Sequence, residues 1–398
     1  MKVSILVSDL SEQGAGRWGG AVRPFLLAQA LQKLECQVEV LGFVNHINPR
    51  LQSTESLPIH QILGNPYPGF LQSAWQLCRK IQGDIIYAYK PKVGSYGVGL
   101  VYHWLTRKPL LLDIDDWELS WHGGDRYQYQ PSIKQLARDI FKADGALRSP
   151  DHPWYLQQLE RWIPWATQIT THNRFLQDRF SGILIPNGKD TLLFNPEMID
   201  PELTRQQYGW QNYRILMFPG APRPYKGLED ILTALDQIND DRYRLVIVGG
   251  SPYDDYDNQL LKIWSRWIIQ LPTTPYVEMP KLIAGSDLIV IPQRNHPSAQ
   301  AQFPLKLTDA MSMAKPILAT RVGDIPEILG DTGYLANPED PSGLAQQIET
   351  IFSDLTIAQK KGEESRLRCR KYYSIEAMAE ILNKVLNRIS DPSRDGIE

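Results

Sequence analysis

Short runs of apolar residues alternate along the chain with longer segments in which apolar residues recur at helical spacing. This alternation is typical of a parallel β-sheet whose strands are connected by helices. In the first half of the chain the apolar runs are rich in β-branched residues, as strands covered on both faces are. We expect strands there at residues 2–7, 37–43, 85–88, 110–114, 168–171 and 183–185, and helices at 22–34, 70–81, 97–106 and 132–141.

The second half repeats this pattern after a seam at residues 186–196. Strands are expected at 214–218, 244–248, 287–291 and 317–319, and helices at 227–238, 258–271, 305–313, 342–352 and 375–389. A chain of 398 residues exceeds the roughly 150 residues of a typical domain. The pattern predicts an α/β protein of two Rossmann-like, doubly wound domains facing each other across a cleft. We expect the N-terminal domain at 1–190, the C-terminal domain at 191–374, and a helix at 375–398 that packs back toward the N-terminal domain.

The composition narrows the class of protein. The net charge is −3 and the isoelectric point about 6.2, so no positive field is present to attract nucleic acid. Cys36, Cys78 and Cys369 are scattered, which fits neither a disulfide framework nor a zinc site and suits a reducing cytosol. The first strand is too short for a signal peptide, and no apolar stretch approaches the ~20 residues that span a bilayer. We expect a soluble, cytoplasmic protein, and eleven tryptophans leave a peripheral contact with a membrane surface open.

Residues 14–20 form a glycine-rich loop between the first strand and the first helix. Their G-x-G-x-x-G pattern, with Glu39 about 20 residues further on, matches the dinucleotide fingerprint. However, residues 9–13 separate the glycines from the strand, and Glu39 falls inside the second strand rather than at its end. The loop is therefore either an anion-binding loop at a helix N-terminus or a plain turn.

A basic loop at residues 218–227 joins a strand to a helix in the second half. Arg223 and Lys226 beside a helix N-terminus, at the carboxyl end of a parallel strand, suit a diphosphate. They would neutralise the charge on a departing nucleoside diphosphate without a metal ion. The alternative is a surface loop with two solvated charges.

A second loop-to-helix segment, residues 303–316, places Lys306 and Asp309 one turn apart on one helix face. A carboxylate there could accept hydrogen bonds from the ribose hydroxyls of a nucleotide. The alternative is that Asp309 complements the helix dipole.

Several segments together resemble the retaining, family 4 glycosyltransferases of the GT-B fold. In the C-terminal half they are "SDLIVIPQR", "LTDAMSMAKPILATRVGDIPEIL" and "TGYLANPEDPSGLAQQI", in that order. The segment "PGAPRPYKG" resembles the family's basic loop and "IPNGKDTLLFNP" its seam between domains. Gly19 and Gly20, followed by Arg23, resemble its N-terminal glycine pair. The resemblance covers nearly the whole chain and is strongest in the C-terminal half.

The resemblance implies a hexosyltransferase that moves sugar from a nucleotide-diphosphate sugar to a hydroxyl of a carbohydrate or lipid-linked acceptor, with retention of configuration. It implies no metal and no cofactor beyond the nucleotide sugar, and a place in polysaccharide or glycolipid biosynthesis. Arg223 and Lys226 would bind the donor diphosphate and Asp309 the ribose. The other expected donor-site residues are Gly19 and Gly20 from the opposite domain, and Phe303, Leu305 and Lys306.

Two positions depart from the family pattern. Its usual glutamate pair is spaced by seven residues, and here the second member falls on Asp309 while the first is Ala301. The glycine of the family's E-x-F-G turn is Pro304. Because the first carboxylate lies close to the transferred sugar in the family, the resemblance leaves donor identity and turnover open, and Lys306 is a candidate replacement.

The acceptor side is expected in the N-terminal half, where the strand at 110–114 is followed by carboxylates. Asp113, Asp115, Asp116 and Glu118 lie at or beyond the carboxyl end of this strand, the end that faces the cleft in doubly wound folds. Asp115 and Asp116 are our candidates, with Arg223 and Lys226, for catalytic residues: a carboxylate can orient an acceptor hydroxyl or take its proton. The alternative is that Asp113 and Asp115 cap the next segment.

Residues 154–165, "WYLQQLERWIPW", mix tryptophans with Arg161. Such a mixture marks either a membrane-facing or acceptor-binding surface, or the packing of a helix in the core, and we favour the packing. For the whole chain, the leading hypothesis is the glycosyltransferase. Its rivals are a non-catalytic GT-B scaffold that binds nucleotide sugars and, on the glycine loop alone, a dinucleotide-dependent oxidoreductase.

Overall fold

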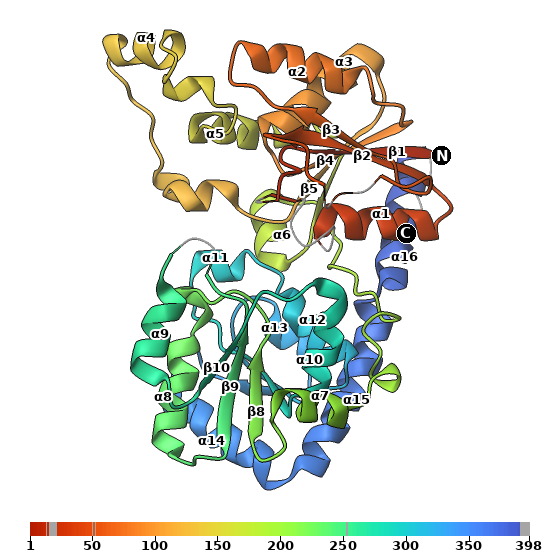
Figure 1. Ribbon diagram of the computed structural model, residues 1–398. Helices are drawn as coiled ribbons and strands as arrows, with labels where there is room; N and C mark the ends of the chain where they lie inside the picture. Colours follow the sequence, from red (N-terminus) through yellow and green to blue (C-terminus); the bar gives the residue numbers. More distant parts are fainter. Residues whose placement is uncertain (13, 16–21, 50, 52, 252–253, 391–398) are drawn as a thin grey trace. The chain divides into compact units, whose positions relative to one another are not determined.

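The computed structural model describes the chain except residues 13, 16–21, 50, 52, 252–253 and 391–398 (Figure 1). The chain forms two compact units. Unit 1 comprises Met1–Gly188 together with Met378–Glu398, and unit 2 comprises Lys189–Ala377. The two units are described separately below.

Unit 1 is built on a seven-stranded parallel sheet in the order β3-β2-β1-β4-β5-β6-β7. The strands are β1 (Lys2–Val7), β2 (Gln37–Val44), β3 (Ile59–Leu63), β4 (Ile85–Tyr89), β5 (Leu110–Ile114), β6 (Gln168–Thr171) and β7 (Ile183–Leu184). Its helices are α1 (Arg23–Lys33), α2 (Gly69–Cys78), α3 (Val98–Thr106), α4 (Ile133–Phe141), α5 (Pro153–Arg161), α6 (Arg174–Phe180) and most of α16 (Ile375–Ser390). The order reverses between β1 and β4, which is the doubly wound topology that the sequence predicts.

Unit 2 contains a six-stranded parallel sheet in the order β10-β9-β8-β11-β12-β13. The strands are β8 (Arg214–Phe218), β9 (Tyr243–Val248), β10 (Ile268–Leu271), β11 (Leu288–Ile291), β12 (Ile317–Thr320) and β13 (Tyr334–Ala336). The helices are α7 (Pro201–Tyr208), α8 (Leu228–Ile238), α9 (Tyr256–Trp264), α10 (Met279–Gly285), α11 (Pro297–Gln300), α12 (Leu305–Ser312), α13 (Ile325–Leu329), α14 (Pro341–Ser353) and α15 (Leu355–Tyr372). The prediction of two parallel α/β sheets is confirmed.

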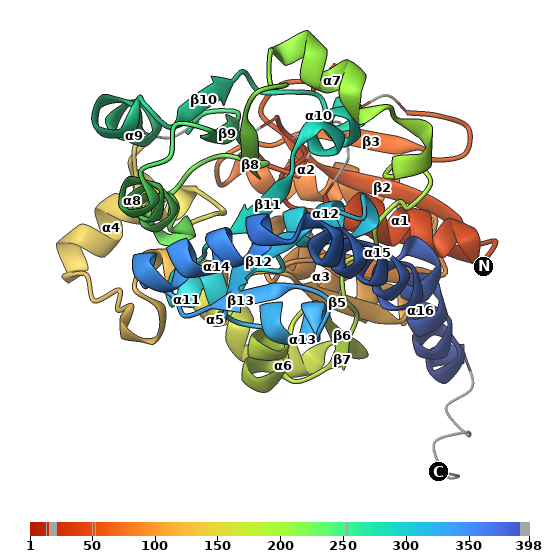
Figure 2. The same ribbon diagram turned by 90° about the horizontal axis from the view of Figure 1, so that it is seen from below.

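The sheet of unit 2 is buried on both faces. Along β8, Leu216 and Phe218 belong to one hydrophobic core, and Ile215 and Met217 belong to another. Because successive side chains of a strand point to opposite faces, this strand contributes to both cores. Figure 2 shows α8 and α14 on one side of the sheet and α10 and α12 on the other. This double burial is the reason that the strand sequences are mostly apolar.

The helix expected at 258–271 is wrong in its second half. Helix α9 ends at Trp264, and residues 268–271 form β10, which pairs with β9 at the edge of the sheet. The edge strands β3 and β13 also lie outside the predicted elements. A short apolar run has no period that distinguishes strand from helix, so its pairing with a neighbour decides the conformation.

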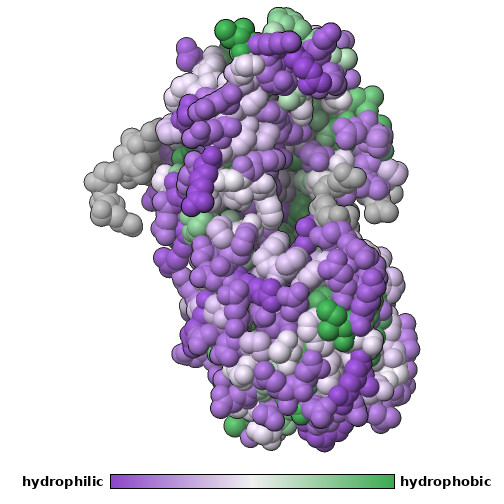
Figure 3. Space-filling view, turned by 90° about the vertical axis from the view of Figure 1, so that its left-hand side faces the viewer, coloured by the Kyte–Doolittle hydropathy of each residue, from purple (hydrophilic) through white to green (hydrophobic). Residues whose placement is uncertain are grey.

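The surface is largely polar. On the face shown in Figure 3, hydrophilic side chains predominate and the hydrophobic ones form small separate patches. Within the part of the chain that the structure describes, no helix is both long enough and apolar enough to cross a membrane.

Candidate functional site

The central strands of unit 2, β8 and β11, are neighbours although β9 and β10 lie between them in sequence. The strand order reverses between them, and in open α/β sheets ligands bind at the carboxyl ends of strands at such a reversal. Two of the predicted segments follow these strands directly. The basic loop leaves β8 at Phe218, and the segment that leads to α11 and α12 leaves β11 at Ile291.

The turn from the basic loop into α8 requires glycine. Gly227 has φ +69°, a left-handed conformation that side-chain-bearing residues rarely adopt. A Cβ atom at this position would overlap the carbonyl oxygen of Pro292, which follows β11. Gly227 therefore allows the basic loop and the segment after β11 to approach closely at the reversal point.

An ion-pair cluster holds the same two segments together. The Arg294 guanidinium donates hydrogen bonds to both Asp230 carboxylate oxygens, at 3.0 and 2.7 Å, and lies 2.7 Å from Glu229. The backbone N–H of Arg294 donates to the carbonyl oxygen of Tyr225 at 2.9 Å. Through Arg294, these contacts fix the segment after β11 to the end of the basic loop and to the first turn of α8.

Two lysines lie together within this frame. The Lys226 ammonium donates to the carbonyl oxygen of Ala221 at 3.2 Å. The Lys306 Nζ atom lies 3.9 Å from the centre of the Phe218 ring, directly beside Gly220. Burial, and then repulsion from the Arg223 charge, lower the pKa of Lys226 to about 8. Burial, and then the charge of Lys226, hold the pKa of Lys306 well below its ordinary value.

These shifts show an excess of positive charge at the reversal point. Besides burial, the charge of Arg223 lowers the pKa of Lys226, and the charge of Lys226 lowers the pKa of Lys306, as like charges in a confined space do. A bound anion would relieve this repulsion. The structure thus brings together three of the residues that the sequence assigns to the donor.

Asp309 is engaged by a residue that the sequence analysis did not single out. Its carboxylate forms a buried ion pair with Lys189, whose ammonium also donates to the Tyr276 hydroxyl at 2.9 Å and lies 4.2 Å from the centre of the Phe194 ring. Burial alone lowers the pKa of Lys189, but the Asp309 carboxylate outweighs burial and raises it. Lys189 stands in the "PNGK" seam motif, which was the available signal for its importance.

The positions that depart from the family pattern are buried. Ala301 is fully buried at the end of α11, and Pro304 is buried at the start of α12. Phe303 is buried as well, with its ring 6.1 Å from that of Tyr373, and Leu305 is half-buried against the same core. The side chain of Phe303 therefore supports the site from within the core.

In unit 1, Asp113 is a structural residue. The Arg23 guanidinium donates two hydrogen bonds of 2.7 Å to its carboxylate, and the Thr170 hydroxyl donates a third of 2.7 Å. Arg23 also donates to the Ile185 carbonyl oxygen at 2.8 Å and to the Asn187 side chain at 2.9 Å. The alternative that Asp113 and Asp115 cap the next segment is wrong, because the short helix at Glu118–His122 begins after Trp117 without a side-chain cap.

Asp115 and Asp116 lie in a charged cluster after β5. Asp115 accepts a 2.5 Å hydrogen bond from the Tyr89 hydroxyl and lies 3.4 Å from the Lys90 ammonium, and Asp116 accepts from the Trp121 indole at 3.1 Å. Burial raises the pKa of Asp115, and it raises that of Asp116 to about 6, with Lys90 opposing both shifts. Asp116 is thus poised to exchange a proton near neutral pH.

Glu118 and two lysines complete this cluster. The Glu118 carboxylate lies 2.5 Å from the Lys90 ammonium and 3.1 Å from that of Lys92. Although burial opposes the change, these two charges lower the pKa of Glu118 to about 2, so it is ionised at neutral pH. Lys90 and Lys92 were not singled out from the sequence. Their position directly after an apolar strand was the signal that pointed to the carboxyl edge of the sheet.

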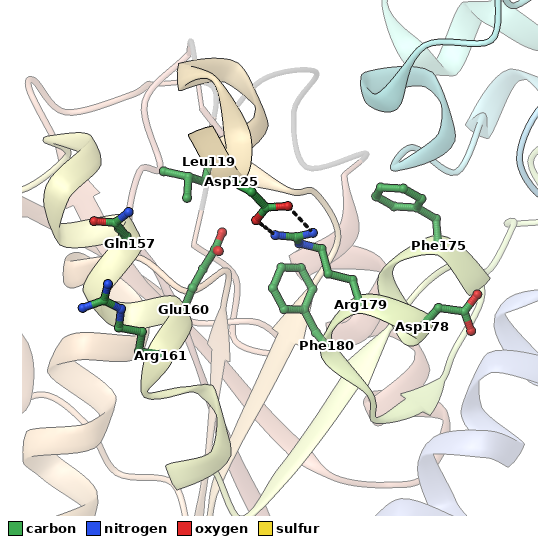
Figure 4. Close-up of a pocket in the computed structure, with 9 residues that line it drawn as sticks. All are labelled: Leu119, Asp125, Gln157, Glu160, Arg161, Phe175, Asp178, Arg179 and Phe180. Atoms are coloured by element: carbon green, nitrogen blue, oxygen red, sulfur yellow. Dashed lines mark hydrogen bonds and ion pairs between the residues drawn. The ribbon is translucent and has the colours of Figure 1, made fainter. Parts of the chain in front are cut away.

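A pocket of about 720 Å³ adjoins this region of unit 1 (Figure 4). Glu160 lies on its wall, and burial raises the pKa of this carboxyl to about 7. Across the pocket, Arg179 forms an ion pair with Asp125 and lies 3.7 Å from the centre of the Trp117 ring. Nothing in the sequence pattern pointed to Glu160, because its neighbours Trp117 and Arg179 come from distant parts of the chain.

The other N-terminal candidates have different outcomes. Glu39 is buried and accepts hydrogen bonds from the Ser4 hydroxyl at 2.5 Å and the Gln82 backbone N–H at 2.8 Å, so it is occupied within the sheet and not aimed at a ribose. Gly19 and Gly20 lie outside the described residues.

The packing expected for the tryptophan-rich segment is wrong for two of its residues. Trp162 and Trp165 are 38% and 47% exposed, and their rings stack at 5.1 Å. The ring of Trp165 also lies 5.6 Å from that of Trp104, which is 49% exposed. These tryptophans form an aromatic cluster on the surface of unit 1.

Comparison with protein families places the cation cluster in a known domain. Residues 213–354, which include Arg223, Lys226, Lys306 and Asp309, match the family described as "Glycosyl transferases group 1". Unit 2 contains a glycosyl transferases group 1 domain. The donor-site residues expected in the C-terminal half therefore fall within the matched segment, whereas Gly19 and Gly20 lie outside it.

Individual relatives extend the similarity to the rest of the chain. The chain is 28% identical to O-antigen chain mannosyltransferase B of Escherichia coli over 183 residues, 44% of this chain and less than half (46%) of that protein. It is 22% identical to D-inositol 3-phosphate glycosyltransferase of Corynebacterium glutamicum over 420 residues, 99% of this chain and 98% of that protein. The crystal structure of Anabaena HepE in complex with UDP and glucose superimposes with a TM-score of 0.71 at 18% identity, covering 97% of this chain and 99% of that one. The chain is a homologue of glycosyltransferases with the GT-B fold.

Proposed function

We propose that this chain is a hexosyltransferase that transfers sugar from a nucleotide-diphosphate sugar to an acceptor hydroxyl with retention of configuration. The observation that carries the proposal is the cluster of Arg223, Lys226 and Lys306 at the strand reversal of unit 2. Three cations confined beside a helix start are arranged to receive the negative charge of a diphosphate.

The same cluster supports catalysis without a metal ion. As the bond to the sugar breaks, negative charge grows on the departing diphosphate, and fixed cations stabilise that charge more than they stabilise the intact donor. Lys226, whose pKa is lowered to about 8, would regain its full charge in contact with the phosphate. Asp309, held by Lys189, is proposed to accept hydrogen bonds from the ribose.

For the acceptor we propose the charged cluster after β5 in unit 1. Asp116, with its pKa raised to about 6, can accept a hydrogen bond or a proton from a sugar hydroxyl, and Asp115 can orient that hydroxyl. The glycosyltransferase relatives support a carbohydrate acceptor. A lipid-linked acceptor is the alternative that we propose. A role in polysaccharide or glycolipid synthesis in the cytoplasm would follow.

Thermal unfolding in the presence of UDP-, GDP- and ADP-glucose tests donor binding. A ligand at about 100 times its Kd stabilises the folded state by about 2.7 kcal/mol, which is readily measured. Because HepE was crystallised with UDP, UDP-glucose is the first donor to try. Arg223→Ala and Lys226→Ala should abolish the shift, whereas Arg242→Ala, a variant of an exposed arginine in the same unit, should retain it. A full shift in both site variants would refute the diphosphate role.

A non-catalytic scaffold that binds nucleotide sugar is the second candidate, and buried Ala301 favours it. A methyl group replaces a carboxylate that lies close to the transferred sugar in the family that the sequence resembles. Release of free nucleoside diphosphate from the stabilising donor separates the two candidates. Slow release that Lys226→Ala abolishes supports the enzyme, and tight binding without release over an acceptor panel supports the scaffold.

A further inference from the structure

Helix α4 (Ile133–Phe141) turns its apolar side outward. Every residue of this helix except Asp139 is exposed. The exposed fractions reach 89% for Ile133 and 80% for Phe141, and Leu136 and Ile140 are exposed as well. A surface helix of a globular protein normally buries such residues against the core. The apolar side of α4 thus faces away from the protein that carries it.

The polar side of α4 holds it in place. The Asp139 carboxylate is buried and accepts hydrogen bonds from the Tyr129 hydroxyl at 2.6 Å and from the Gln135 amide at 2.7 Å. The Ser132 side chain caps the first turn by accepting a hydrogen bond from the Gln135 backbone N–H. These contacts hold the polar side of α4 toward the protein. The apolar residues on the other side of the helix therefore point outward.

The charges of α4 lie beside its apolar sector. At about 100° per residue, the apolar sector spans about 140° of the helix surface. It contains Ile133, Leu136, Ala137, Ile140 and Phe141. Lys134 and Arg138, and then Lys142 just beyond the helix, are spaced by four residues and form a basic row along one border of that sector. This combination of an apolar face and a basic border suits a negatively charged lipid surface.

Two other helices of unit 1 also expose apolar side chains. Figure 1 shows α2 and α3 at the upper edge of unit 1, as α4 is. These two helices carry further exposed apolar side chains, with Trp75 60%, Trp104 49% and Leu105 70% exposed. Tryptophan is enriched at membrane–water interfaces because its ring is apolar and its N–H is polar.

We propose that α4 docks unit 1 on the surface of an anionic lipid membrane, with its apolar sector in the headgroup region and its basic row against the headgroups. A second copy of the chain fits this surface less well. A stable dimer buries about 800 Å² per partner, whereas nine residues of helix extend only about 13 Å. A membrane accepts such a small convex contact because charge attraction adds to the apolar burial. The inference does not rest on the proposed sugar transfer.

Co-sedimentation with lipid vesicles tests the proposal on the full chain. The chain should bind vesicles of equal parts phosphatidylglycerol and phosphatidylcholine and leave pure phosphatidylcholine vesicles largely unbound. The double variant Ile133→Glu/Phe141→Glu should bind at least about tenfold more weakly. Lys134→Gln/Lys142→Gln should lose about fivefold for each charge removed, and high salt should have a similar effect.

The matched control is Ile263→Glu, which changes an apolar residue of α9 in unit 2 that is 68% exposed. It should bind vesicles as the unchanged chain does. An unchanged thermal transition shows that each variant is folded. The proposal is overturned if the chain does not sediment with anionic vesicles or if the Ile133→Glu/Phe141→Glu variant binds them normally. Self-association that this double variant abolishes, without vesicle binding, would instead identify a second copy as the occupant.

Discussion

Replacing Lys189 by methionine removes one half of a buried ion pair in unit 2. Lys189 is 2% exposed and its partner Asp309 11%, so neither charge has much access to water. Methionine preserves most of the packing against the Phe194 ring, whereas the Asp309 carboxylate loses its counter-charge. Removing one partner of such a pair costs about 3–5 kcal/mol. At about 2–4 °C per kcal/mol for a unit of this size, the thermal midpoint of unit 2 should fall by about 6–20 °C.

The pH dependence of stability, and then a double variant, separate the effect of the lost charge from that of a packing defect. In Lys189→Met, the buried Asp309 carboxyl has a raised pKa in the folded state, so the destabilisation should shrink as the pH falls and this group takes up a proton. In the unchanged chain the raised pKa of Lys189 means that the pair contributes its stability below the unfolded pKa of lysine and loses it as the pH rises through the folded pKa.

The double variant Lys189→Met/Asp309→Leu should recover most of the lost stability, because an apolar pair replaces the ionic one. Differential scanning calorimetry from pH 5 to pH 9 gives the cost of Lys189→Met, the decrease of that cost at low pH, and the recovery in the double variant. The reasoning is refuted if Lys189→Met costs less than about 1 kcal/mol, or if the double variant is no more stable than the single one.

Four other predictions concern the site and its supports. Gly227→Ala should destabilise unit 2 by more than about 1 kcal/mol and abolish the thermal shift with UDP. The reason is that the φ of Gly227 is positive and that an added Cβ atom would overlap the carbonyl oxygen of Pro292. Unchanged stability would contradict the close approach of the two segments. Arg23→Met should destabilise unit 1 by about 3–5 kcal/mol in urea unfolding, since it leaves the buried Asp113 charge without its guanidinium partner, and equal stability would contradict the structural role of this pair. UDP binding measured by calorimetry should weaken above pH 8 by up to tenfold per pH unit as Lys226 loses its proton, and Lys226→Met should remove that slope. Asp116→Asn should lower turnover of the stabilising donor and remove an acid limb near pH 6 from the rate profile, and an unchanged profile would exclude Asp116 as the base.

The central strands could be predicted from the hydrophobic pattern because their burial is a local property of the sequence. A strand covered by helices on both faces is apolar at almost every position: β5 departs from this only at Asp113, and β8 only at Arg214. The segment at 268–271 lacked such a signal. It became the strand β10 because β9 offered it a hydrogen-bonding edge, which only the folded sheet supplies.

The candidate site was also predictable only in part from the sequence. The order and spacing of motifs along the chain identified Arg223, Lys226 and Asp309, because the turn chemistry that presents them is local. Their partners are not local: Lys189 meets Asp309 across 120 positions.

Tertiary structure alone decided the state of these groups. Burial and neighbouring charges depend on distances in space, and they make Asp113 a structural ion pair while leaving Asp116 with a pKa of about 6. The sequence by itself thus determined which residues were available and where the sheets would form. Packing determined which charges are paired, which are crowded together, and why α4 presents its apolar residues to the outside.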